Sequence, residues 1–499
     1  MKKNYSAKMV LQASLLFFMI ITTNMFGQVG IGTVTPNVSS VLDVYSTTQG
    51  MLTPRMTTLQ RTAIASPADG LIVYDTDLKS FCHYNSTLSS WNKISSEGNG
   101  RLKFKIIRST DVLATVLAAE KTAGGGAKYL LDTNTLYEIN GIVNVDLPIE
   151  LNNAYLIGMD AGEDKLIKAS GDLFTGTTGG SVKVLTLTAT SGNVVNVIGT
   201  GSIAGGTQTQ SLVLRDCIVA SSSNVGKIEN FALAFVSIVQ FLGNTTGIVY
   251  KDISKVLLSN AAWFGNNSGT YEAFQGTFGL VEKTGGFSEV YGAGIGIDVS
   301  SNPTITGDAV VESVVFTGTL TTGQYVKGYT VGSYTGYNFN DRWTVRSGGV
   351  PNEGDGVAVG DVNFDYAVGS GASTTFSGGS VKTKLAGNTT SNNLFRFSTD
   401  SQNNRLKYLG KKKRYFTANG ALSFQSSADN TTYIVYVAKN GTVVNQSKVY
   451  VRSNSSNDVL AIPLVATVEL STNDYVEIWA ERFAGSGSML TVSLNLSLY

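Results

Sequence analysis

Short apolar segments separated by turns rich in Gly, Asn, Ser and Asp fill the chain from Tyr129 to about Thr330. The central residues of successive segments are 27, 30, 16, 25, 27 and 30 residues apart: Tyr155, Val182, Leu212, Ile228, Ile253, Leu280 and Val310. Most of these intervals suit one coil of a right-handed parallel β-helix, in which stacked coils bury a shared core. Because the period is not strict, an ordinary antiparallel β domain is the alternative.

Residues 393–499 show a cleaner alternation of apolar and polar positions. Runs such as RYFTANGALSFQSS, TTYIVYVAK and LAIPLVATVELS are typical of strands with one buried face. The Asn440-Gly441 pair between two such runs predicts a type I′ hairpin. Seven or eight short strands over this interval predict a β-sandwich of jelly-roll type.

The first 27 residues have the pattern of a secretory signal peptide. Three lysines (Lys2, Lys3 and Lys8) precede a mostly apolar run from Met9 to Ile21, and the small residue Gly27 precedes Gln28. We expect cleavage between Gly27 and Gln28. The apolar run is too short to span a bilayer and no later stretch approaches the required length, so the sequence predicts an exported protein, extracellular or on the outer cell surface.

A compact module follows the predicted cleavage point. It contains GIGT at 30–33, LDV at 42–44, PRMT at 54–57, PADGLIVY at 67–74 and Trp91, with a helical turn predicted at Leu59 to Ile64. These motifs resemble the N-terminal module of many Gram-negative secreted surface proteins and phage-tail-like fibres. The resemblance implies a small β-rich mount or linker.

The C-terminal strands carry a second resemblance. The segments AKNGT at 438–442, VELS at 468–471, NDYVEIW at 473–479 and the final run at 490–498 resemble the jelly rolls of tail-fibre-like and tailspike-like proteins. Those domains are similar to the trimeric heads of the tumour-necrosis-factor and complement type. The resemblance implies a homotrimer with Tyr475, Ile478 and Trp479 near the three-fold axis.

Together these patterns predict an all-β protein with six segments. They are a signal peptide (1–27), an N-terminal mount module (28–96), a linker with a short helix (97–128), a β-helix-like shaft (129–342), a connecting β segment (343–392) and a jelly-roll head (393–499).

Charge and cysteine content narrow the range of partners. The chain has 37 Lys+Arg and 36 Asp+Glu, and loss of three signal-peptide lysines leaves 34 against 36. This balance argues against nucleic acid and against electrostatic docking on an anionic membrane. Two cysteines, Cys82 and Cys217, are too few for a disulfide scaffold, and we expect two buried thiols.

The residues for most kinds of catalysis are missing from the sequence. His83 is the only histidine, which excludes multi-histidine metal sites and Ser-His-Asp arrangements over nearly all of the chain. The acidic residues Glu353, Asp355, Asp361 and Asp365 do not fit a calcium loop. We therefore predict no catalytic, metal or cofactor site and no cofactor. The basic run at 411–414 (KKKR) is interpreted as a solvated guard on an edge strand.

Paired carboxylates on a β-helix are the one chemistry left open. Tailspike-like β-helices often cleave polysaccharides with two acids, and Glu272, Glu282, Glu289 and Asp298 lie in the right part of the chain. Only Glu272 and Asp298 have the spacing of one coil. The sequence thus favours a secreted, non-enzymatic structural or adhesive fibre-like surface protein. Its expected partners are its own copies and a glycan or cell-envelope component. A polysaccharide-degrading enzyme and a subunit of an extracellular filament remain the alternatives.

Overall fold

The computed structural model describes residues 5–20, 27–94 and 103–499, and the chain forms two compact units, residues 1–100 and 101–499. Helix α1 (Tyr5–Ile20) covers most of the apolar run of the predicted signal peptide. No helix within the described ranges is long and apolar enough to cross a membrane. The polar stretch before the predicted cleavage point lies outside the described residues.

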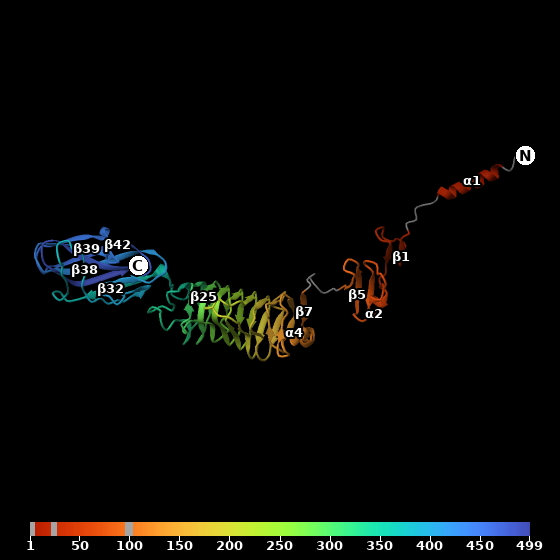
Figure 1. The fold of residues 1–499 in the computed structure, drawn as a ribbon, viewed down its shortest axis with the longest axis horizontal. Coiled ribbons are helices and arrows are strands. Elements are labelled where there is room, and N and C mark those ends of the chain that lie inside the picture. The colour runs from red at the N-terminus through yellow and green to blue at the C-terminus, as the bar shows by residue number, and fades with distance from the viewer. Residues whose placement is uncertain (1–4, 21–26, 95–102) are drawn as a thin grey trace. The chain divides into compact units, whose positions relative to one another are not determined.

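The N-terminal module is a small β-rich unit, as predicted (Figure 1). Strands β1 (Val29–Ile31) and β2 (Leu42–Val44) form a parallel pair. A four-stranded sheet contains β3 (Arg55–Met56), β4 (Ile72–Asp75), β5 (Ser80–Asn85) and β6 (Ser90–Lys93). The predicted helical turn is α2 (Thr58–Thr62), which begins at a capping box formed by Thr57 and Gln60.

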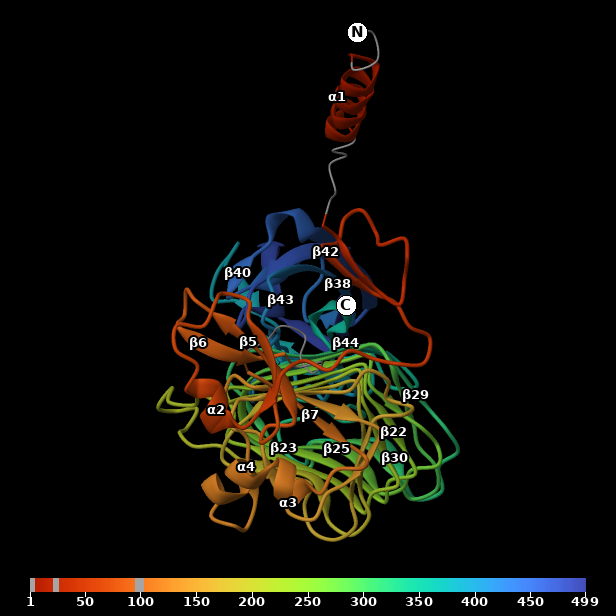
Figure 2. The same cartoon turned by 90° about the vertical axis from the view of Figure 1, so that its right-hand side faces the viewer.

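Residues 104–348 form a parallel β-helix, which confirms this prediction over the antiparallel alternative. Its 25 strands belong to one continuous sheet, and Figure 2 shows the coils close to end-on. The two helices at its start are α3 (Leu113–Val116) and α4 (Ala118–Ala123). The strands are β7 (Phe104–Arg108), β8 (Tyr129–Leu130), β9 (Leu136–Asn140), β10 (Ile142–Asn144), β11 (Ile149–Glu150), β12 (Tyr155–Ile157), β13 (Lys165–Lys168), β14 (Phe174–Gly176), β15 (Gly180–Lys183), β16 (Thr186–Ala189), β17 (Asn193–Ile198), β18 (Ser211–Arg215), β19 (Ile218–Ala220), β20 (Asn224–Glu229), β21 (Leu233–Ser237), β22 (Gln240–Leu242), β23 (Thr246–Ser259), β24 (Ala262–Trp263), β25 (Thr270–Thr284), β26 (Phe287–Glu289), β27 (Ile295–Asp298), β28 (Thr304–Ile305), β29 (Ala309–Thr317), β30 (Gln324–Lys327) and β31 (Trp343–Gly348).

Stacked inward-facing side chains build the core of this shaft. One inner column runs through Leu156, Val182, Leu214, Val236, Leu258, Lys283, Val311 and Val345, at intervals of 26, 32, 22, 22, 25, 28 and 34 residues. The predicted 16-residue interval from Leu212 to Ile228 is not a coil, because Leu212 pairs with Ala234 and Ile228 lies on another wall. Coil length varies because turns of different size connect walls of similar strand length.

Residues 359–498 form an antiparallel two-sheet sandwich around its own apolar core. The first sheet has the order β35-β32-β44-β38-β42 and the second β36-β37-β43-β39-β40, with β33, β34 and β41 pairing at their margins. Asn440 and Gly441 have φ values of 50° and 74°, which confirms the predicted type I′ turn. The strands are β32 (Val359–Asp365), β33 (Ala372–Thr374), β34 (Thr383–Lys384), β35 (Leu394–Phe395), β36 (Phe397–Ser398), β37 (Leu406–Tyr408), β38 (Arg414–Ser426), β39 (Thr431–Lys439), β40 (Thr442–Val443), β41 (Val449–Ser453), β42 (Val459–Leu470), β43 (Tyr475–Ala484) and β44 (Met489–Leu498), and single 3₁₀ turns lie at Asp355–Val357 and Asn445–Ser447.

Two of the expected segment boundaries differ from the structure. The interval 343–392 is not a separate connector, because β31 is the last strand of the shaft while β32, β33 and β34 pair within the sandwich. Similarly, β7 within the expected linker 97–128 pairs with β9 and belongs to the shaft. In both places single short strands pair with partners distant in sequence, which local patterns do not reveal.

Candidate functional site

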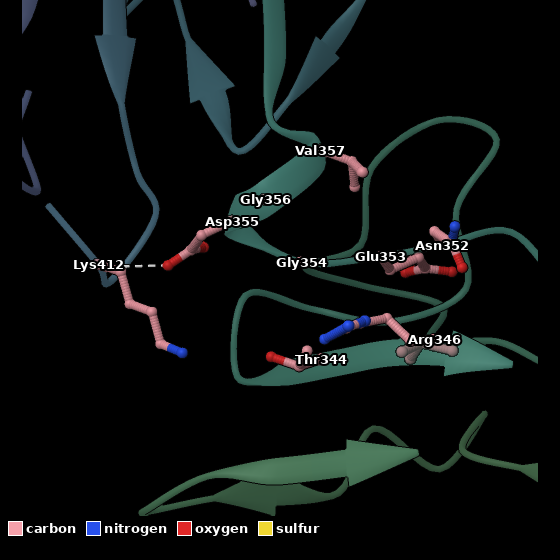
Figure 3. Close-up of a pocket in the computed structure, with 10 residues that line it drawn as sticks. Thr344, Arg346, Asn352, Glu353, Gly354, Asp355, Gly356, Val357 and Lys412 are labelled. Atoms are coloured by element: carbon pink, nitrogen blue, oxygen red, sulfur yellow. Dashed lines mark hydrogen bonds between the residues drawn. The ribbon is translucent and has the colours of Figure 1, made fainter. Parts of the chain in front are cut away.

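A pocket of about 380 Å³ lies where the last coil of the shaft meets the sandwich (Figure 3). Thr344, Val345 and Arg346 of β31 form one side, and the 352–357 loop forms another. Lys412 comes from the basic run that precedes β38. The pocket is thus shared by shaft and head, a place where binding sites are often found.

Backbone N–H groups already occupy the two carboxylates in the pocket wall. Glu353 is 1% exposed and accepts hydrogen bonds from the N–H groups of Asn338 (2.8 Å) and Phe339 (2.9 Å). Burial raises the pKa of Glu353 despite these bonds. Asp355 accepts from the N–H groups of Lys411 (2.8 Å) and Lys412 (2.7 Å). These carboxylates hold loops together, and no group of three or more potential metal ligands occurs in the described part of the chain.

The basic run at 411–414 fastens the head to the shaft. The Lys411 ammonium lies 2.7 Å from Oδ1 of Asp308, which precedes β29, and Arg414 donates to the carbonyl of Asp355. The interpretation of this run as a solvated edge guard is therefore wrong for Lys411 and Arg414. The pattern of four basic residues carries no information about which acids they meet.

Arg396 adds a buried link at the same junction. Its side chain is 1% exposed, and its guanidinium donates to the carbonyl of Trp343 at 2.6 Å. Its Nε also lies 3.8 Å from the Asp355 carboxylate. The sequence analysis missed this residue, since a lone arginine between two phenylalanines gives no signal of a long-range role.

The acids considered for polysaccharide cleavage do not come together. Glu272 pairs in register with Ile297 and points into the shaft, where it forms a fully buried ion pair with Lys283 at 3.0 Å. Asp298 pairs with Ala273, one position along, and lies on the outside beside Lys327 at 3.5 Å. The 26-residue spacing of Glu272 and Asp298 is thus one residue away from a coil register. Burial raises the pKa of Glu272, although the Lys283 ammonium opposes the shift.

The residues expected at a three-fold axis lie on both sides of strand β43. Ile478 is 1% exposed and packs in the core of the sandwich, so its side chain is not available for a contact between copies. Tyr475 and Trp479 lie on the outer face, on either side of Glu477. Glu477 accepts from Lys384 (2.7 Å), Arg405 (2.8 Å) and Trp479 Nε1 (2.9 Å). Charged groups therefore hold this face within one chain.

The outer face of the other sheet has a different character. Outward residues of its central strands are small, amide, hydroxyl or apolar, in rows such as Ser493–Ser423–Ala461 and Asn495–Ala421–Pro463 across β44, β38 and β42. Val465 and Tyr415 on this face are 64% and 65% exposed. A flat and nearly uncharged sheet face of this kind is typical of a protein contact. We call it the uncharged head face.

The N-terminal module exposes many apolar side chains. Its own buried apolar residues are few, whereas large residues stand open on its surface. The most exposed are Val34 (99%), Val38 (91%), Leu52 (82%), Val41 (81%) and Leu59 (79%). Both cysteines of the chain are free and buried, as predicted.

The architecture and these surfaces are similar to those of phage tail-fibre and tailspike proteins. Residues 30–109, about a sixth of the chain, match the family model of a phage tail like trimerisation region. This match confirms the predicted resemblance and places the trimerisation signal in the N-terminal part of the chain, not in the head.

A solved structure of bacteriophage CBA120 tailspike protein 4, described as its enzymatically active domain, is 11% identical to this chain. The match covers 90% of this chain and 77% of that chain, with a TM-score of 0.22, which is too low to support any conclusion. No curated protein matches the sequence.

Proposed function

We propose that this chain is an exported, homotrimeric fibre-like surface protein that binds a glycan or another cell-envelope component through its shaft or head. The observation that carries the proposal is the trimerisation match at residues 30–109 on a module whose apolar side chains are exposed in the single chain. Burial of those side chains between copies would supply a driving force of about 25 cal/mol per Å².

The head offers the second contact between copies in this proposal. The uncharged head face, with Val465 and Tyr415, suits a contact between copies better than the face with Tyr475 and Trp479, where Glu477, Arg405 and Lys384 would have to be desolvated. We propose a jelly-roll head whose uncharged face meets its copies, so that the charged face stays open.

Binding is a better account than hydrolysis for the residues of this shaft. Glu272, the acid with the most favourable spacing, is sealed inside with Lys283 and cannot reach a polysaccharide. The proposal therefore assigns no catalytic residue.

Export is tested by expression in a Gram-negative host and N-terminal sequencing of the released protein. We expect cleavage between Gly27 and Gln28 and a mature chain that starts QVGIGT. A retained Met1, or a start beyond about Val34, would contradict export by this route.

A further inference from the structure

We propose that the pocket between shaft and head binds a carboxylate-bearing saccharide, with Arg346 and Lys412 as its anion-binding residues. This inference rests on the proposed function and names the chemical class of the glycan. It starts from the charges that the pocket leaves uncompensated.

The two cations of the pocket are available, while its two carboxylates are not. Glu353 and Asp355 accept backbone hydrogen bonds that fix loops 338–339 and 411–412, so their charge is already used. Among the described residues, no carboxylate is paired with the Lys412 ammonium. Arg346 meets only Glu312, at 3.4 Å, in a pair whose side chains are 68% and 45% exposed. Such an exposed pair contributes about 0–1 kcal/mol and gives way readily to a better partner.

The placement of the two cations fits one anionic group. In the view of Figure 3, the side chains of Arg346 and Lys412 point toward each other across the pocket. A planar guanidinium binds a carboxylate with two parallel hydrogen bonds, and an ammonium adds a point charge. These are the groups that a uronic acid carboxylate requires.

The remaining lining fits a sugar ring. Val357, 45% exposed, and Thr344 give aliphatic surface for the C–H groups of a pyranose, and Asn352 supplies an amide for its hydroxyls. The volume of about 380 Å³ lies within the range of small-ligand sites. The lining is therefore more specific for an acidic saccharide than for a free inorganic anion.

Calorimetry on the full mature protein tests the assignment. The probes are oligomers of galacturonic acid, the same oligomers with the carboxyl groups reduced to alcohols, and inorganic sulfate. We expect oligogalacturonate to bind, the reduced oligomer to bind at least about tenfold more weakly, and affinity to fall with salt. Arg346→Gln and Lys412→Gln should each weaken binding about tenfold or more, because each removes a charge-assisted hydrogen bond.

A matched control is Lys413→Gln, which removes a charge from the same basic run at a residue that pairs with Glu469 and does not line the pocket. It should bind as the wild type does, and thermal unfolding should be the same for all three variants. Equal binding of acidic and reduced oligomers, or wild-type binding by the Arg346→Gln/Lys412→Gln double variant, would overturn the inference. If the protein bound only neutral glycans, the inference would fail while the proposed function stood; if it bound no glycan or envelope preparation, both would fail.

Discussion

At the scale of single residues, the most informative side chains are Glu272 and Lys283, which place a charge pair inside an aliphatic shaft. Glu272 occupies a column of inward residues between Ile248 and Ile297, and Lys283 stands between Leu258 and Val311. Neighbouring coils thus show which apolar residues each position accepts. The hydrophobic pattern could predict the columns, but it could not predict that two charges inside them would compensate each other.

This arrangement predicts a strongly non-additive pair of substitutions. Glu272→Ile alone leaves the Lys283 ammonium buried without a partner and should lower the free energy of unfolding by about 3–5 kcal/mol. The double variant Glu272→Ile/Lys283→Leu extends both columns and should be about as stable as the wild type or more stable. Thermal unfolding followed by circular dichroism measures both effects. Additive losses in the double variant would show that the pair contributes stability that apolar packing cannot replace.

A second buried pair controls the acid stability of the N-terminal module. Asp75 is fully buried and accepts from the N–H groups of Leu78 and Asp77, from Arg61 Nε at 2.8 Å and from Thr58. Burial by itself would raise the pKa of Asp75, but these hydrogen bonds lower it to about 2. Because the folded form holds the carboxylate charged, this stabilisation is complete above about pH 4, the pKa range of an unfolded aspartate, and is lost as the pH falls to about 2.

The imidazole of His83 gives a direct readout, because it is the only histidine and lies on β5 of this module. Its proton resonances should report thermal unfolding of the module at progressively lower temperature from pH 4 to pH 2. Asp75→Asn should unfold at lower temperature at neutral pH and show a smaller change over that window. An Asp75→Asn variant with the same acid dependence as the wild type would assign the effect to other carboxylates.

At the scale of elements, local patterns predicted most strands but not how they are shared between domains. Alternation located the long strands of the head, such as β38, β42 and β44, because each buries one face over many residues. Short strands such as β34 and β35 hold only two residues, too few for a periodic signal, and their pairing depends on distant partners. The pocket at the junction was unpredictable for the same reason, since Arg346 and Lys412 are brought together only by the docking of head on shaft.

The two faces of the head make opposite predictions for substitution. Val465→Asp puts a charge on the uncharged head face and should weaken the trimer, since the charge would be desolvated in the contact. Trp479→Asp, on the charged face, should leave the trimer intact. Light scattering of the two variants distinguishes the faces. A monomer from Trp479→Asp together with a trimer from Val465→Asp would return the contact to the face of Tyr475 and Trp479.

At the scale of the whole molecule, the chain combines an N-terminal module with exposed apolar residues, a β-helix and a β-sandwich. The β-helix is quasi-one-dimensional, because each coil contacts only its neighbours, and it has no short-range means of setting the number of chains. The number of copies must therefore be set by the module, by the head or by both. The family match at residues 30–109 assigns this role first to the N-terminal module.

The most direct test of this account is the native mass of the mature protein from Gln28 to Tyr499, measured by mass spectrometry at several dilutions. We predict one species with three times the mass of a single chain, and we predict that deletion of residues 28–94 weakens the trimer so that it dissociates at higher concentration than the intact protein. A stable monomer at every concentration, or a truncated protein that stays trimeric at the same dilution as the intact one, would contradict the account.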